Sequence, residues 1–100
     1  MDIVKSKNNV PIRLTAERWL HITDEHSEMA GYYFDVLNTI QNPEVIYAGK
    51  SGELIAVKEI EIGKYIIVVY KELNENDGFI ITSFLTRETK QIERRIKLWP

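Results

Sequence analysis

The chain has 100 residues, of which 44% are hydrophobic and 28% charged, and its formal net charge is −2. This length and composition indicate one globular domain over residues 1–100 and exclude a disordered chain. The absence of cysteine excludes disulfides, thiolate nucleophiles and thiolate metal sites. Because no signal peptide begins the chain and its longest apolar run, Tyr65–Tyr70, is too short to span a bilayer, we expect a cytoplasmic protein with no membrane partner.

The charges are unevenly distributed along the chain. Residues 24–61 carry eight acidic and two basic side chains, whereas residues 87–97 carry five basic and two acidic ones. The negative total argues against a general nucleic-acid binder. The basic C-terminal segment has two interpretations, a solvated helix face or a surface that touches a phosphate backbone.

The N-terminal segment predicts two short strands and a helix. Ile3–Lys5 and Pro11–Leu14 are extended candidates, separated by turn-forming asparagines. Thr15 is a good N-cap for a helix that starts at Ala16. We expect Thr23–Glu25 to interrupt this helix.

A second helix follows, with the clearest periodicity in the chain. Ser27 is its expected N-cap, and Asn42 followed by proline is its expected end. Apolar residues recur at helical spacing and predict the helix side of the core together with Trp19. They are Met29, Tyr32, Tyr33, Val36, Leu37 and Ile40.

Beyond Pro43 the period changes from helical to alternating, which predicts strands. The expected strands are Val45–Ala48, Leu54–Ile62, Tyr65–Glu72 and Phe79–Leu85. Short loops between them favour an antiparallel meander. A helix over Arg87–Lys97, with Ile92 and Ile96 facing inward, is expected at the end. The predicted fold is α+β, with two N-terminal helices packed on an antiparallel sheet of four or more strands and a short C-terminal helix.

Some polar residues interrupt apolar strand faces. Lys58 shares a face with apolar residues, so it lies either at a strand edge with its stem on apolar surface or in a cleft. Lys71 has the same two interpretations. In the last strand, strict alternation puts Thr82 and Thr86 on one face and Phe79 on the other.

The two histidines, His21 and His26, lie just before the periodic helix. Histidine is the side chain whose charge changes near neutral pH, so proton-transfer chemistry is expected to start here. The alternatives are two structural histidines or a metal site formed by both with Glu25. The spacing of the pair fits no standard zinc pattern, so we expect no metal and no cofactor.

Five blocks of the sequence resemble a family of small phage-associated and cyanobacterial domains. The blocks are Arg18–Ile22 with His26–Met29, Thr39–Tyr47, Val68–Lys71, Phe79–Thr86 and Ile96–Trp99. This family is grouped with the barnase, EndoU, colicin and RelE-like nucleases, which share the BECR fold. Ser27 replaces the usual proline, and the chain is acidic where the family is basic.

The resemblance implies a four-stranded antiparallel sheet with helices on one face, and a site made of His21, His26, Lys71, Thr82 and Thr86. His26 would be the general acid or base and His21 its partner or orienter. Two threonines would position a phosphate. Its charge would be neutralised by Lys71 and Arg18, with Lys58 a further phosphate-binding candidate.

Two functions from different classes follow from these observations. The retained His, Lys and Thr residues favour a metal-independent, toxin-like ribonuclease that leaves a 2′,3′-cyclic phosphate. The acidic charge favours a non-catalytic interaction module of the same fold that binds protein or nucleic acid. RNA and an inhibitory protein are the partners that the resemblance implies.

Overall fold

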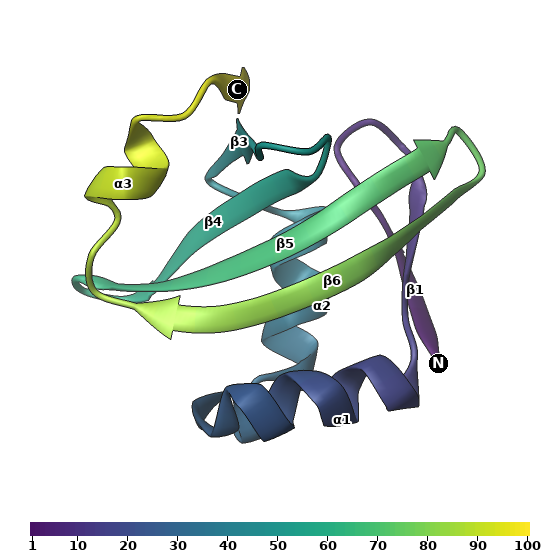
Figure 1. Ribbon diagram of the computed structural model, residues 1–100, viewed down its shortest axis with the longest axis horizontal. Helices are drawn as coiled ribbons and strands as arrows, with labels where there is room; N and C mark the ends of the chain where they lie inside the picture. The colour runs from purple at the N-terminus through teal and green to yellow at the C-terminus, as the bar shows by residue number, and fades with distance from the viewer.

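Seven strands form one sheet in the computed structural model, which describes residues 1–100 (Figure 1). The strand order across the sheet is β1-β2-β6-β5-β4-β3-β7. In chain order the elements are β1 Asp2–Lys5, β2 Pro11–Leu14, α1 Ala16–Glu25, the 3-10 helix η1 Ser27–Gly31, α2 Tyr33–Gln41, β3 Val45–Ala48, β4 Leu54–Glu61, β5 Lys64–Asn74, β6 Asp77–Thr86, α3 Lys90–Glu93 and β7 Lys97–Trp99. The predicted α+β class is confirmed. No helix is long and apolar enough to cross a membrane.

Helix α1 begins where its capping chemistry predicts. The Thr15 hydroxyl accepts a hydrogen bond from the Arg18 backbone N–H at 3.1 Å, which satisfies one of the free amides of the first turn. The expected interruption at Thr23–Glu25 is wrong, because the helix continues to Glu25. The Thr23 hydroxyl donates to the Trp19 carbonyl at 3.1 Å, so this residue satisfies its polar group inside the helix.

The predicted helix over Met29–Ile40 is divided in two. Residues Ser27–Gly31 form η1, and α2 begins only at Tyr33, after a break at Tyr32. Gly31 disfavours a continuous helix, and Ser27 makes no capping hydrogen bond. The apolar face is nevertheless confirmed where it is most periodic, since the buried residues are Met29, Val36, Leu37 and Ile40.

The sheet has two faces with different partners. The face that we call the helix face carries Ala56, Ile66, Val68 and Tyr70, which form one core cluster with the buried residues of η1 and α2. The opposite face, which we call the open face, carries a smaller cluster of Ile55, Val57 and Ile67, against which Ile92 of α3 packs. In Figure 1, α2 passes behind β5 and β6, while α1 runs beside β6.

One pair of strands departs from the expected antiparallel order. β2 lies parallel to β6, with Ile12 opposite Gly78 and Arg13 opposite Phe79. The intervening helices and strands supply the long connection that a parallel pair needs. Gly78 permits the close approach, since a Cβ there would lie 2.5 Å from Ile12 Cδ1 and 2.6 Å from the Lys71 carbonyl oxygen.

The predicted C-terminal helix over Arg87–Lys97 is wrong in extent. A turn in which the Thr86 hydroxyl accepts from the Glu88 N–H at 3.0 Å delays the helix, and α3 is a single turn. The chain then forms β7, where the Ile96 carbonyl accepts from the Ala48 N–H at 2.8 Å and covers the outer edge of β3. Ile96, expected to face inward, is 73% exposed.

We predict that Leu37→Ala lowers the free energy of unfolding by about 2–5 kcal/mol, because it removes a buried side chain and leaves a cavity. Leu37 is 6% exposed, whereas Phe34 on the same helix is 76% exposed. Phe34→Ala is therefore the matched control and should change the stability by less than about 0.5 kcal/mol. Urea melts measure both variants, and equal losses would contradict the assigned helix orientation.

Candidate functional site

A β-bulge in β6 determines which side chains reach the open face. Tyr70 of β5 pairs with Ile80, but the preceding residue, Val69, pairs with Thr82, so Ile81 is an extra, unpaired residue. Strict alternation along β6 is therefore wrong. Because of the bulge, Phe79 and Thr82 lie on the same face instead of opposite ones.

A side chain of α1 binds the backbone of the bulge. The Ile81 carbonyl accepts a hydrogen bond from Arg18 Nη1 at 3.3 Å, which joins α1 to the edge of β6 that β2 does not cover. An uncovered strand edge exposes unpaired backbone groups. Arg18 thus satisfies one of them and fixes α1 beside the open face.

Lys71 and Thr82 lie on the open face of β5 and β6. Lys71 pairs with Phe79, and Thr82 pairs with Val69, so the two residues are diagonal neighbours at roughly 7–8 Å in a regular sheet. Lys71 has no carboxylate within ion-pair distance. Its Cε would lie 4.0 Å from a Cβ on Gly52, so its stem leans toward the β3–β4 turn. A cation without a carboxylate partner is available to an anionic ligand.

The Thr82 hydroxyl is unusual in this structure. Its Oγ1 is the one buried side-chain oxygen or nitrogen without a hydrogen-bond partner. The next residue, Ser83, is also buried, but its hydroxyl donates to the Ile67 carbonyl at 2.7 Å on the helix face. A buried hydroxyl without a partner costs about 1–3 kcal/mol, so Thr82 is either a stability defect or a group kept for a ligand.

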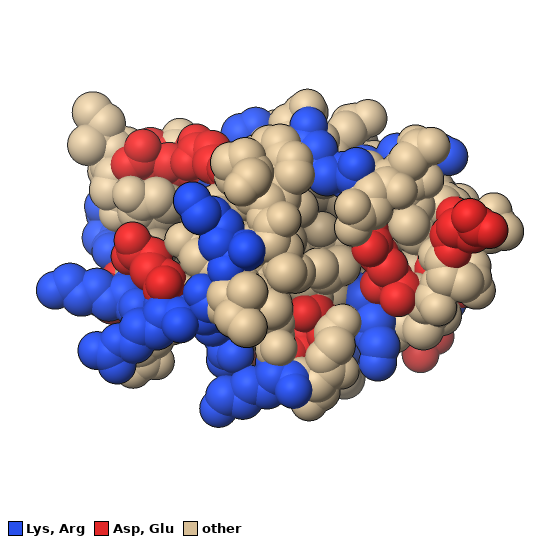
Figure 2. All heavy atoms as spheres, turned by 90° about the horizontal axis from the view of Figure 1, so that it is seen from above, with Lys and Arg blue, Asp and Glu red and all other residues tan.

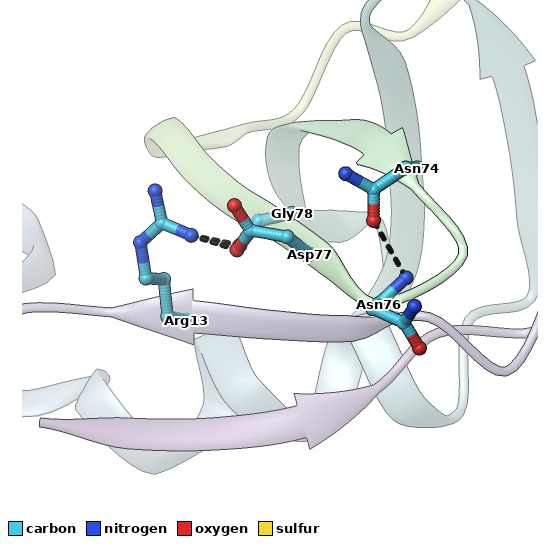
Figure 3. A network of polar contacts seen from close by, with 5 residues as sticks. All are labelled: Arg13, Asn74, Asn76, Asp77 and Gly78. Carbon is cyan, nitrogen blue, oxygen red and sulfur yellow. Dashed lines mark hydrogen bonds and ion pairs between the residues drawn. The ribbon is translucent and has the colours of Figure 1, made fainter.

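Arg13 extends the site onto β2. Its guanidinium carbon lies 5.7 Å from the centre of the Phe79 ring, and it forms an ion pair with Asp77 (Figure 3). Since Arg13 pairs with Phe79 and Phe79 with Lys71, an arginine, an aromatic ring and a lysine form a row across three strands. Sequence reasoning missed Arg13 and Phe79, although the alternation of buried and half-buried residues in β2 was a usable signal.

The two histidines lie in different places. The His26 ring is centred 5.6 Å from the Phe84 ring of β6, and its Nδ1 lies 3.6 Å from a Glu28 carboxylate oxygen. His21 is exposed on α1, with Nε2 3.9 Å from Glu25. His26 therefore borders the open face, and the neighbour that faces its ring nitrogen is Glu28 rather than His21. No group of three or more His, Asp or Glu side chains is arranged to hold a metal ion.

Two further candidates from the sequence are separated from Lys71 and Thr82. Thr86 lies on the open face opposite Tyr65, but its hydroxyl is engaged in the turn with Glu88. Lys58 pairs with Ile66, whose side chain belongs to the helix-face core, so Lys58 lies on the helix face. Lys71 and Thr82 are therefore diagonal neighbours on the open face, whereas His26 lies against Phe84, further along β6.

Arg18 and His21 line a cleft of about 340 Å³ beside the open face. The cleft lies where β2 ends and α1 begins, against β6. Its lining residues are Arg13, Thr15, Glu17, Arg18, His21, Phe79 and Ile80. Phe79 lines the cleft and also lies on the open face, so the cleft is next to the row formed by Arg13, Phe79 and Lys71.

The end of the open face near α3 carries charges of both signs, since the negative charge of Glu59, with those of Glu44 and Glu93, raises the pKa of Tyr65 there. Lysines and arginines gather at the end of the molecule that carries α3, on the left of Figure 2. The basic residues of this segment are Arg87, Lys90, Arg94, Arg95 and Lys97. In the β3–β4 turn, a hydrogen bond from the Ser51 backbone N–H, helped by the charge of Arg95, lowers the pKa of Glu53.

The structure is an α+β domain in which η1 and α2 pack on the helix face of the sheet, while α3 packs by Ile92 on the open face. The chain belongs to the family described as phage-Barnase-EndoU-ColicinE5/D-RelE like nuclease2, which matches residues 1–99. Searches of curated proteins and of solved structures return no significant match. The resemblance of the sequence blocks to BECR nucleases is confirmed by this match.

We predict that Thr82→Val raises the free energy of unfolding by about 0.5–2 kcal/mol, because valine has nearly the same shape and no unpaired hydroxyl. Ser83→Ala is the matched control on the same strand. It removes a satisfied hydroxyl and should lower the stability by about 0.5–1.5 kcal/mol. Chemical denaturation distinguishes the two, and a similar loss in both variants would refute the unpaired state of Thr82.

Proposed function

We propose that this domain cleaves RNA on the open face of its sheet without a metal ion. The observation that carries the proposal is an unneutralised Lys71 on the open face, with the buried and partnerless Thr82 hydroxyl on the neighbouring strand and His26 further along that strand. A lysine without a carboxylate and a hydroxyl without an acceptor are both suited to phosphate oxygens. Membership of the nuclease-like family supports this use of the surface.

The reaction would be an in-line attack of an RNA 2′-oxygen on the adjacent phosphorus. A base accepts the 2′-hydroxyl proton as the new P–O bond forms, and an acid gives a proton to the 5′-oxygen as the P–O5′ bond breaks. The products are a 2′,3′-cyclic phosphate and a 5′-hydroxyl. Only proton transfers and charge stabilisation are required of the protein.

His26 is the residue that we assign to proton transfer. Its Nδ1 lies 3.6 Å from a Glu28 carboxylate oxygen, within ion-pair distance but beyond hydrogen-bond length, and Nε2 has no ion-pair partner in the protein. Lys71 would neutralise the charge that develops on the phosphorane, and Thr82 would donate to one of its oxygens. Thr86 is left out of this role because its hydroxyl serves the turn with Glu88.

A non-catalytic interaction module is the second candidate. Two observations favour it, since the net charge is −2 and the histidines do not converge. Such a module would use the same open face to bind RNA or a protein partner. Its binding would survive the loss of His26, because binding needs no proton transfer.

The test is cleavage of mixed RNA in EDTA at low salt by the purified wild type and three variants. We expect His26→Ala and Lys71→Ala to lower the rate by about 10²–10⁴-fold, the usual cost of losing such a group. Lys58→Ala removes the same charge from the helix face and should keep the wild-type rate within about twofold. The wild-type rate should depend on pH in a bell shape, as one base and one acid require.

Equal RNA loss in the wild type, His26→Ala and Lys71→Ala would reveal a contaminating nuclease and contradict the proposal. No cleavage by the wild type across about pH 5–8 would contradict it as well. In that case, RNA binding that persists in His26→Ala would establish the interaction module. Identical melting temperatures exclude misfolding as the cause of any difference.

A further inference from the structure

The cleft between β2, α1 and β6 has no role in the reaction described above. Its volume of about 340 Å³ lies near the lower end of the roughly 300–1,000 Å³ of ligand pockets. It is lined by two arginines, one histidine and an aromatic ring, against one glutamate. This composition suits a small anionic ligand that has a flat ring.

We propose that the cleft binds one nucleotide of the RNA, with its base against Phe79 and its phosphate on Arg18 and His21. The inference rests on the proposed function and names a substrate subsite next to the reaction surface. It concerns recognition of a nucleotide flanking the cleaved bond.

The base would stack in the part of the cleft formed by Arg13 and Phe79. Phe79 is half-buried, and the Arg13 guanidinium lies over its ring at 5.7 Å. Asp77 pairs with Arg13, which neutralises the guanidinium and holds it in place (Figure 3). Aromatic rings and arginine planes are the surfaces on which unpaired RNA bases stack.

The phosphate would bind on the α1 side of the cleft. Arg18 makes one hydrogen bond, at 3.3 Å to the Ile81 carbonyl, and no ion pair, so most of its donors are free. His21 follows Arg18 by three residues and therefore lies on the same helix face, with 65% of its side chain exposed. Glu17 is an acceptor for a base amino group and disfavours a second phosphate in the cleft.

The position of Phe79 connects this subsite with the reaction surface. Phe79 lines the cleft and pairs directly with Lys71 across β5 and β6. Neighbouring strands are about 4.8 Å apart, so a nucleotide on Phe79 would present its linkage to the Lys71 side. A single RNA strand can therefore occupy the cleft and the open face together.

The test titrates adenosine 5′-monophosphate, adenosine and inorganic phosphate into ¹⁵N-labelled protein at low salt. We expect the nucleotide to bind at least about tenfold more tightly than either fragment and to shift the amides of Thr15, Arg18, His21 and Phe79. Phe79→Leu should weaken nucleotide binding about 5–100-fold and leave phosphate binding unchanged. Arg18→Gln should weaken both about tenfold or more.

Lys58→Gln is the charge control, because Lys58 lies on the helix face of β4 and does not line the cleft. It should leave nucleotide affinity unchanged. No shift up to about 10 mM nucleotide, or shifts centred on Lys71 and Thr82, would overturn the proposal. If Arg18→Gln does not fold, the proposal is decided by the amide shifts of the wild type and by the nucleotide and phosphate affinities of Phe79→Leu.

The outcome is separable from that of the cleavage assay. Nucleotide binding in the cleft by a protein that cuts no RNA would contradict the nuclease mechanism and leave the subsite established. Cleavage by a protein whose cleft takes no nucleotide would support the mechanism and reject the subsite.

Discussion

The irregular pairing of β6 with β5 at Ile81 is the constraint on which the candidate site depends. The extra residue turns Phe79 and Thr82 to the same face while Ile80 and Ser83 remain in the helix-face core. Bulges are frequent beside active sites because they redirect a side chain without breaking the sheet. Here the bulge leaves one buried hydroxyl without a partner, and it provides the carbonyl that Arg18 uses to hold α1. The bulge thus determines which β6 side chains lie on the open face. Through the hydrogen bond to Arg18 it also positions α1, which lines the neighbouring cleft.

The net charge of the chain is negative, so an RNA-binding surface requires that the fold gather basic side chains locally. The total is −2, but the basic C-terminal residues surround α3, which packs by Ile92 against the open-face cluster. Lys71 lies on the same face without an acidic partner. Electrostatic attraction of a polyanion depends on such local patches more than on net charge. RNA on the open face would therefore be attracted by Lys71 and the basic residues around α3, and repelled by the carboxylates of Glu44, Glu59 and Glu93 beside Tyr65.

Local sequence signals predicted the parts of the fold that local chemistry determines. The cap at Thr15, the end of α2 before Pro43 and the strands β3–β6 follow from side-chain chemistry and period. The parallel pairing of β2 with β6 and the strand β7 depend on contacts between residues far apart in the chain. Ile96 is an example, because helical spacing placed it inward while pairing with β3 leaves it exposed.

The candidate site was predictable by residue type but not by arrangement. Lys71 and Thr82 were named from the sequence, and the β5–β6 register makes them neighbours. The bulge at Ile81 has no sequence signal comparable to a glycine or a proline, so Phe79 was assigned to the wrong face. The histidines were grouped because they are close in the chain, yet the end of α1 at Glu25 separates their surroundings.

The central claim is that RNA binds on the open face of the sheet, and the position of bound RNA tests it most directly. A short oligomer with 2′-deoxy sugars lacks the attacking hydroxyl and therefore stays intact on the protein. Titrated into ¹⁵N-labelled protein, it should shift the amides of Val69, Lys71, Thr82 and Phe84 most strongly, because these residues lie on the open face. Shifts confined to α2, which packs on the helix face of the sheet, would contradict the account.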